Sequence, residues 1–151
     1  MQRLLLAAVA ALGLASALPA AAQFRNAEAA VKYRQSVMQV QGFHLGRIFA
    51  MANGRLPFDA KVVAEDAMVL DTVDKLPFMA FGEGTDKVAA SKAKPELWKE
   101  RAKFDAAALK MQEDVTKLNA AAKTGSQDAI KAAVGTVGQS CKACHDAYQV
   151  Q

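Results

Sequence analysis

Cys141-Lys142-Ala143-Cys144-His145 is the stretch that decides how this chain is interpreted, and it lies close to the carboxyl end of 151 residues. Cys-x-x-Cys-His is the attachment signature of a c-type haem, in which two thiols add to the vinyl groups and the histidine binds iron. Residues three and four apart share one face of a helix, so both sulfurs and the imidazole can meet one porphyrin. We therefore predict one covalent haem c, held by Cys141 and Cys144, with His145 as an axial ligand of iron.

Two other uses of the same motif are less well supported by the rest of the sequence. A thioredoxin-type dithiol opens a helix after a strand, and no segment here has the pattern of a strand. A structural zinc site needs four ligands, whereas the chain has two cysteines and only one other histidine, His44. A lone histidine on a helix is more often a surface residue than a ligand, and we expect that of His44.

The first 22 residues have the pattern of a secretory signal peptide. A positive start at Arg3 precedes an apolar run, which closes on the small residues of Ala20-Ala21-Ala22. The run is short and no stop-transfer pattern follows it, so we do not expect a membrane anchor. We predict cleavage after Ala22, one domain over residues 23–151 and a periplasmic location, which agrees with haem attachment outside the cytoplasm.

The overall charge gives little support to nucleic-acid binding. The sequence has 19 Lys and Arg against 15 Asp and Glu, and removal of the leader takes away Arg3. Ionised haem propionates would lower the remaining excess further. Because no basic run is interleaved with aromatic residues, we expect a solvated surface of mixed charge.

Four helical patterns follow the leader. We expect helices at about residues 27–51, 59–75 and 95–123, with Asn26, Asp59 and Pro95 at their starts, and a fourth that Ser126 caps and that continues to Tyr148. The first apolar stripe contains Val31, Met38, Leu45 and Phe49, and the fourth contains both cysteines. Short connections favour antiparallel neighbours, so the predicted fold class is an all-α, antiparallel four-helix bundle.

The connection at residues 77–94 is long for so small a domain. Its first half carries Phe78, Met79 and Phe81, which we expect to fold back onto the core or the cofactor, whereas its polar half should bulge outward. Because both cysteines lie in register with the core stripe, the motif should point into the bundle. Gly135 and Gly138 weaken the fourth helix, and close approach of a neighbouring backbone or of the haem is the expected reason.

The chain resembles the cytochrome c′ family along essentially the whole of residues 23–151. The resemblance is carried by Gln23-Phe24, the run Val31 to Ser36, His44 with Gly46-Arg47, Leu76-Pro77 to Phe81-Gly82 with Gly84-Thr85, and Cys141 to Tyr148. It implies a four-helix bundle that is usually a homodimer formed through the first two helices.

The resemblance also implies how the site works. The iron is typically five-coordinate, with His145 proximal and an apolar side chain at the position of Met38 closing the distal side. Such proteins bind nitric oxide and carbon monoxide. Arg34 and Gln35 match positions near the haem propionates, and Phe81 matches an aromatic residue beside the distal face. Gln149 departs from the arginine or lysine that many members carry at its position.

Two functional classes remain open at this point. In the first, the protein binds small gaseous ligands at a vacant iron position guarded by apolar bulk. In the second, Met38 binds iron opposite His145, and the protein is a low-spin electron carrier, since methionine is an axial partner of histidine in cytochromes c. We expect no enzymatic role, because no Ser-His-Asp or paired-carboxylate arrangement stands out.

Overall fold

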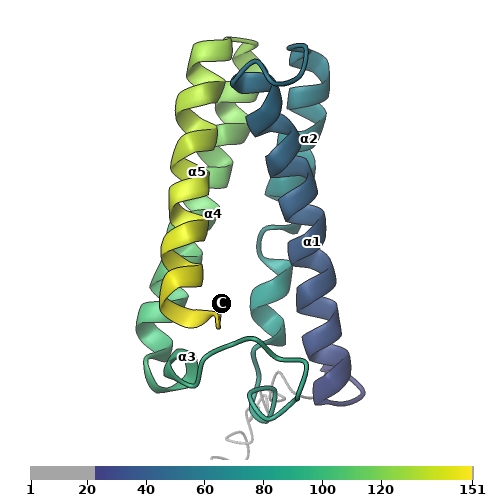
Figure 1. The fold of residues 1–151 in the computed structure, drawn as a ribbon, viewed down its shortest axis with the longest axis vertical. Coiled ribbons are helices and arrows are strands. Elements are labelled where there is room, and N and C mark those ends of the chain that lie inside the picture. The colour runs from purple at the N-terminus through teal and green to yellow at the C-terminus, as the bar shows by residue number, and fades with distance from the viewer. Residues whose placement is uncertain (1–22, 151) are drawn as a thin grey trace, which may run out of the picture.

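The computed structural model describes residues 23–150, and the predicted leader lies outside them. Their elements, in chain order, are the helices α1 (Ala27–Ala52) and α2 (Ala60–Val73), the 3₁₀ helix η2 (Leu76–Ala80), the short helix α3 (Glu96–Lys99), and the helices α4 (Arg101–Thr124) and α5 (Gln127–Tyr148). Figure 1 shows the four long helices as an antiparallel bundle, with α1 and α4 rising and α2 and α5 descending. The predicted fold class is confirmed.

The helices begin at the residues whose side chains can cap them. The Asn26 side chain accepts a hydrogen bond from the backbone N–H of Ala29 at 2.8 Å. Asp59 does the same at the start of α2, and Ser126 at the start of α5. Each oxygen satisfies an amide that the first helical turn leaves without a partner. Helix α4 ends at Gly125, which has φ +69°, a left-handed conformation that glycine adopts without steric cost.

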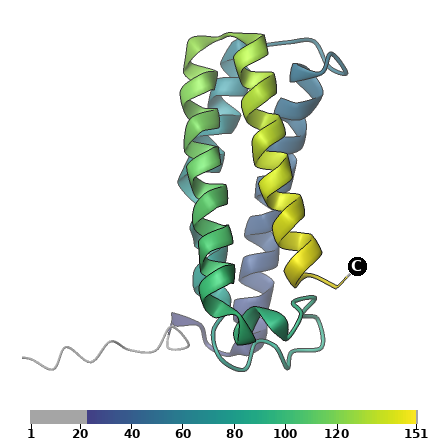
Figure 2. The same ribbon diagram turned by 90° about the vertical axis from the view of Figure 1, so that its left-hand side faces the viewer.

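The third predicted helix is divided in two, so the expectation of one continuous helix at residues 95–123 was wrong. Pro95 does start the helical segment, but Glu100 leaves the helical region at φ −113° and ψ 39°. The break lets α3 fold across the end of the bundle and buries Leu97 in the core (Figure 2). Helix propensity depends on neighbouring residues in the sequence and does not report the packing of Leu97, which accompanies the break.

The core is built as two clusters stacked along the bundle axis. The larger one joins all four long helices through side chains such as Ile48, Val63, Leu118 and Val134. The smaller one contains Phe81, Leu97, Phe104 and Tyr148. The predicted stripe on α1 was wrong at one position: Ile48 is completely buried, whereas the Phe49 side chain next to it is 38% exposed.

The long connection folds back through Phe78 and Phe81 as expected, but the expectation was wrong for Met79, which is 41% exposed. Its aromatic half forms η2, and the Phe81 ring lies on the Phe104 ring with their centroids 5.0 Å apart. In the polar half Glu83, Asp86 and Lys87 are exposed as expected, but Thr85 is buried. Within residues 23–150 no helix is long and apolar enough to cross a membrane.

Candidate haem site

A cavity of about 640 Å³ lies between α1, α4, α5 and the long connection. Its walls are mostly apolar, with lining residues that include Met38, Leu45, Leu70, Phe78, Phe81, Leu97, Phe104, Met111, Val115 and Val137. In Figure 1 the lower parts of α1 and α5 diverge from each other in this region. The volume lies within the roughly 300–1,000 Å³ that is usual for ligand and cofactor sites.

The Cys-x-x-Cys-His motif lies in the last two turns of α5 and borders this cavity. Cys141 and Cys144 are half-buried, free of any disulfide and part of the cavity lining. His145 lines the cavity as well, although much of its side chain is exposed. The sequence was therefore right that the cysteines face inward, and the helix brings both sulfurs and the imidazole to one wall.

The environment of the two thiols keeps them neutral. Burial raises the pKa of Cys141, and the charge of Asp114 adds to the effect. Burial likewise raises the pKa of Cys144. A free thiol already titrates above neutral pH, so both sulfurs carry their protons at pH 7 in the unloaded chain.

Met38 and Phe81 form a part of the cavity wall that does not come from the helix of the motif. Met38 is on α1, is half-buried and packs against the cluster of Phe81 and Tyr148. Phe81 is buried and also lines the cavity. Both side chains are apolar, so this wall offers bulk, with the thioether sulfur as its one soft donor atom.

Arg34 lies one turn before Met38 and is buried, with only 3% of its surface exposed. Its Nη1 donates to the carbonyl oxygen of Ala80 and to Oγ1 of Thr85, both at 3.0 Å, and Nη2 donates to Oγ of Ser91 at 2.8 Å. The guanidinium carbon lies 4.1 Å from the centre of the Phe81 ring. Arg34 thus lines the cavity and anchors the long connection at the same time, and its predicted contact with a propionate stays a prediction.

Gln35, the other residue expected near the propionates, also contacts the connection. Its Nε2 donates to the carbonyl oxygen of Ala90 at 2.8 Å, and the residue lines the cavity. Gln149 and Lys92 complete the cavity rim near His145.

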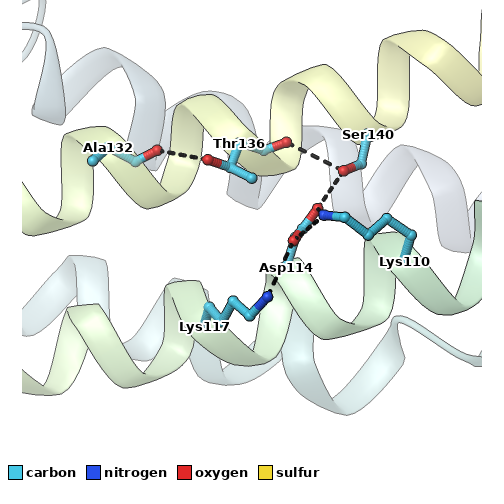
Figure 3. A network of polar contacts seen from close by, with 6 residues as sticks. All are labelled: Lys110, Asp114, Lys117, Ala132, Thr136 and Ser140. Carbon is cyan, nitrogen blue, oxygen red and sulfur yellow. Dashed lines mark hydrogen bonds and ion pairs between the residues drawn. The ribbon is translucent and has the colours of Figure 1, made fainter.

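Sequence reasoning did not find the buried carboxylate of Asp114. Figure 3 shows its side chain on α4 reaching Ser140 on α5, with Lys110 and Lys117 on its other side. Ser140 directly precedes Cys141, so this contact docks the start of the motif against α4. Asp114 follows Lys110 by four residues and precedes Lys117 by three, so the spacing weakly indicates ion pairs on one helix face. Nothing in the sequence indicates that the carboxylate is buried.

A second buried carboxylate joins α1 and α2 away from the lining of the cavity. The Oδ1 and Oδ2 atoms of Asp66 accept from Nδ1 of His44 and Nε of Arg47, each at 2.6 Å. His44 is half-buried in this ion-pair network, not on an open surface as expected. Among residues 23–150 no group of three or more His, Cys, Asp or Glu side chains could hold a metal, so the zinc alternative has no ligand set there.

The residues of the cavity fit a covalently bound haem. Two thiols and an imidazole share one wall, apolar side chains supply most of the surface, and a buried arginine stands at one edge. A histidine is one of the side chains that hold haem iron in proteins, and the burial and polarity of the surrounding pocket tune its chemistry.

Comparison with known proteins agrees with this arrangement. The family model for cytochrome c′ matches residues 29–149. Cytochrome c′ of Rubrivivax gelatinosus is 50% identical over 127 residues, which cover 84% of this chain and 98% of that protein. Cytochrome c′ of Alcaligenes xylosoxydans xylosoxydans is 43% identical over 127 residues, with the same coverage.

Solved structures show the same fold. The crystal structure of the Rubrivivax gelatinosus protein superimposes with a TM-score of 0.82 at 49% identity, covering 85% of this chain and 100% of the other. The nitric oxide complex of a variant of cytochrome c prime from Alcaligenes xylosoxidans gives a TM-score of 0.79 at 42% identity, covering 85% and 99%. Proteins of this type carry covalently bound haem c. The chain belongs to the cytochrome c′ family, and haem c is its cofactor.

Proposed function

We propose that this protein is an exported cytochrome c′ with a five-coordinate, high-spin haem that binds nitric oxide and carbon monoxide. Cys141 and Cys144 would hold the haem, and His145 would be its axial ligand. The observation that carries the proposal is the composition of the cavity lining: α5 contributes the two thiols and the imidazole of the motif, whereas Met38 of α1 and Phe81 of the long connection contribute apolar side chains to the same cavity. Bound haem supplies an iron that can take a diatomic ligand.

The polarity of the distal wall supports this choice of ligand. Hydrogen-bond donors, polarity and access on the distal side decide what a haem pocket binds. His145 is the only histidine among the residues that line the cavity. A wall of Met38 and Phe81 therefore gives a bound diatomic ligand no imidazole donor, which suits nitric oxide and carbon monoxide better than dioxygen.

Relatives of known structure support the same reading. Structures of variants of the Alcaligenes xylosoxidans protein have been solved with nitric oxide bound and with carbon monoxide bound, at 42% identity to this chain. We extend this ligand class to the present chain because the matched region includes both walls of its cavity.

A second candidate function rests on one specific observation. Met38 lines the same cavity as His145, so its sulfur is available as a sixth ligand. Iron bound by histidine and methionine would make the protein a low-spin electron carrier. The two functions differ in whether Met38 is a ligand or a plug.

Replacing Met38 by leucine separates the two candidates. If Met38 is a plug, the ferric and ferrous optical spectra of Met38→Leu stay high-spin like those of the unmodified protein. If Met38 is a ligand, the variant changes from low-spin to high-spin and gains carbon monoxide binding, which contradicts our proposal. Met111→Leu is the matched control, since Met111 is on α4 and also lines the cavity.

Attachment and export are tested together by mass. We propose cleavage after Ala22 and covalent linkage through both cysteines. Protein isolated from the periplasm of a host competent for cytochrome c maturation should have the mass of residues 23–151 plus one haem, and Cys141→Ala with Cys144→Ala should abolish the haem increment. A chain of that mass with two free thiols would contradict the assignment.

We also propose a homodimer formed through α1 and α2. Phe43 on α1 is 64% exposed, and Val40, Phe49, Leu56 and Met68 are exposed as well. Large exposed apolar side chains are a feature of interaction surfaces. Phe43→Ser should weaken the dimer in sedimentation at micromolar concentration, whereas Leu109→Ser on α4, where Leu109 is 60% exposed, should not. A monomeric unmodified protein at every concentration would refute the dimer.

A further inference from the structure

Residues 90–94 form a strap that crosses the lower end of the bundle from α1 to the end of α5. At the α1 end, the carbonyl oxygen of Ala90 accepts from Gln35 Nε2, and Oγ of Ser91 accepts from Arg34 Nη2, each at 2.8 Å. Arg34 and Gln35 lie one turn before Met38. The strap is therefore fixed to the helix that carries the Met38 wall.

The other end of the strap pairs with the residues that follow the haem motif. The backbone N–H of Lys94 donates to the carbonyl oxygen of Tyr148, and that of Val150 donates to the carbonyl oxygen of Lys92, each at 2.8 Å. Ala93 and Gln149 form an antiparallel β-bridge between them. The strap is thus joined to the chain within four residues of His145.

Lys94 makes a further contact that bears directly on His145. Its Nζ donates a hydrogen bond to the carbonyl oxygen of Asp146 at 2.8 Å, and its backbone N–H donates to the carbonyl oxygen of Tyr148. The last four carbonyl groups of a helix have no partner within the helix. One residue therefore satisfies two of them, and its positive charge lies at the end where the helix dipole favours a cation.

The last turn of α5 depends on this arrangement. The carbonyl oxygen of His145 accepts from the backbone N–H of Gln149 at 2.9 Å, the final hydrogen bond of the helix. Val150, whose amide would continue the helix onto Asp146, instead donates to Lys92. Without the Lys94 side chain the Asp146 carbonyl loses its hydrogen-bond donor, and the turn that carries the imidazole loses its one side-chain hydrogen bond to the strap within residues 23–150.

The strap also forms part of the cavity wall beside the imidazole. Lys92, Ala93 and Gln149 line the cavity together with His145. Ala93 packs against the cluster that contains Phe81 and Tyr148. A shift of the strap would therefore change both the position of the helix end and the space next to His145.

We propose that Lys94 is a positioning residue for His145: by capping the end of α5 from the strap, it fixes the imidazole relative to the iron. The inference rests on the proposed function, in which His145 is the axial ligand. The same strap is also bound to Arg34 and Gln35 of α1. The position of the imidazole therefore depends on the α1 side of the cavity as well.

The test compares Lys94→Met with Lys94→Arg and Lys99→Met in the haem-loaded protein. Arginine keeps a cationic donor that can reach the Asp146 carbonyl, and Lys99 is an exposed lysine of α3. Two readouts are needed, namely amide hydrogen exchange at Gln149 and the iron–histidine stretching band of the ferrous protein in resonance Raman spectra.

In Lys94→Met we expect exchange at Gln149 to become roughly fivefold faster, from the loss of one hydrogen bond to the turn. The iron–histidine band should broaden and move to lower frequency, because the imidazole is held less firmly. Both changes should be reversed in Lys94→Arg and be absent in Lys99→Met.

An unchanged band in Lys94→Met would overturn the proposal even if exchange increased, because Lys94 would then stabilise the helix end without positioning the ligand. Unchanged exchange would overturn it in either coordination state of the iron. By contrast, absence of the band from the unmodified ferrous protein would contradict the five-coordinate site of the proposed function. In that case amide exchange at Gln149 in Lys94→Met would still test whether Lys94 holds the end of α5.

Discussion

Replacing Arg34 by methionine should destabilise the protein strongly, because one buried side chain holds the long connection against α1. The substitution removes three hydrogen bonds, to Ala80, Thr85 and Ser91, and the contact with the Phe81 ring. Methionine is unbranched, so it can fill much of the space left by the aliphatic part of the side chain.

The opposing effects can be compared in magnitude. Hydrogen bonds from a charged donor contribute about 1.5–3 kcal/mol each, and a cation over an aromatic ring adds about 0.5–2 kcal/mol. Against this, burial lowers the pKa of Arg34 from 12.5 to about 10. At 1.36 kcal/mol for each pKa unit, that burial costs the charged form roughly 3 kcal/mol. The three hydrogen bonds and the ring contact outweigh this cost, so we expect a net loss of at least about 2 kcal/mol.

This loss is measured by urea unfolding of the haem-loaded protein, at one fixed protein concentration, with far-ultraviolet circular dichroism as the signal. Lys32→Met is the matched control, since it removes an exposed cation from the same helix. Arg34→Lys should give an intermediate value, because lysine keeps the charge without the planar fork. If Arg34→Met changed the free energy of unfolding no more than Lys32→Met did, the hydrogen bonds would not be stabilising and the reasoning would be refuted.

Three other substitutions test the account of the fold. Gly135→Ala should stabilise the protein by about 0.5–1 kcal/mol in thermal unfolding, since a Cβ there would meet no atom within 4 Å; a loss would show a hidden contact. Burial raises the pKa of Asp74, and one of its oxygens has no hydrogen-bond partner within residues 23–150. Asp74→Asn should therefore stabilise the protein at pH 7, and this gain should shrink as pH falls from the raised folded pKa to the unfolded value of about 4, below which the acid is protonated in both states; an equal gain at all pH values would contradict this. Burial alone would raise the pKa of Asp114, but hydrogen bonds from Lys110 and Ser140 outweigh burial, and the pKa is lowered. The ionised carboxylate therefore stabilises the folded protein above about pH 4, and this stabilisation is lost as pH falls through the lowered pKa of the folded state. Asp114→Asn should therefore lower the urea midpoint at pH 7 and flatten its decline between about pH 5 and pH 3, and a decline as steep as that of the unmodified protein would count against the buried ion pair.

The local features of this fold could be predicted from the sequence because they depend on neighbouring residues. Asn26, Asp59 and Ser126 cap the helices at which they were expected, since a cap needs only its own first turn. The positions of Cys141 and Cys144 at the cavity follow from their register with the core stripe of one helix. Both predictions needed helix geometry and no knowledge of the partner helices.

Features that depend on distant residues could not be predicted. The buried Asp114 accepts from Ser140, which is 26 residues away in the sequence, and the hydrogen bond from Arg34 to Ser91 spans 57 residues. We expected Gly135 and Gly138 to permit close approach of a neighbouring backbone or of the haem; the structure contradicts the first alternative, because a Cβ at either position would meet no atom of residues 23–150 within 4 Å, and the second stays a prediction. A sequence pattern shows that a glycine weakens a helix, but not whether a neighbour occupies the space beside it.

The most direct test of the central claim is the optical spectrum of the purified ferric and ferrous protein, recorded before and after addition of nitric oxide. A five-coordinate haem in the cavity lined by Met38 and Phe81 would give high-spin spectra in both oxidation states and a prompt spectral change with nitric oxide. Sharp low-spin ferrous bands, a weak far-red ferric band typical of sulfur–iron ligation and no ready reaction with nitric oxide would contradict it.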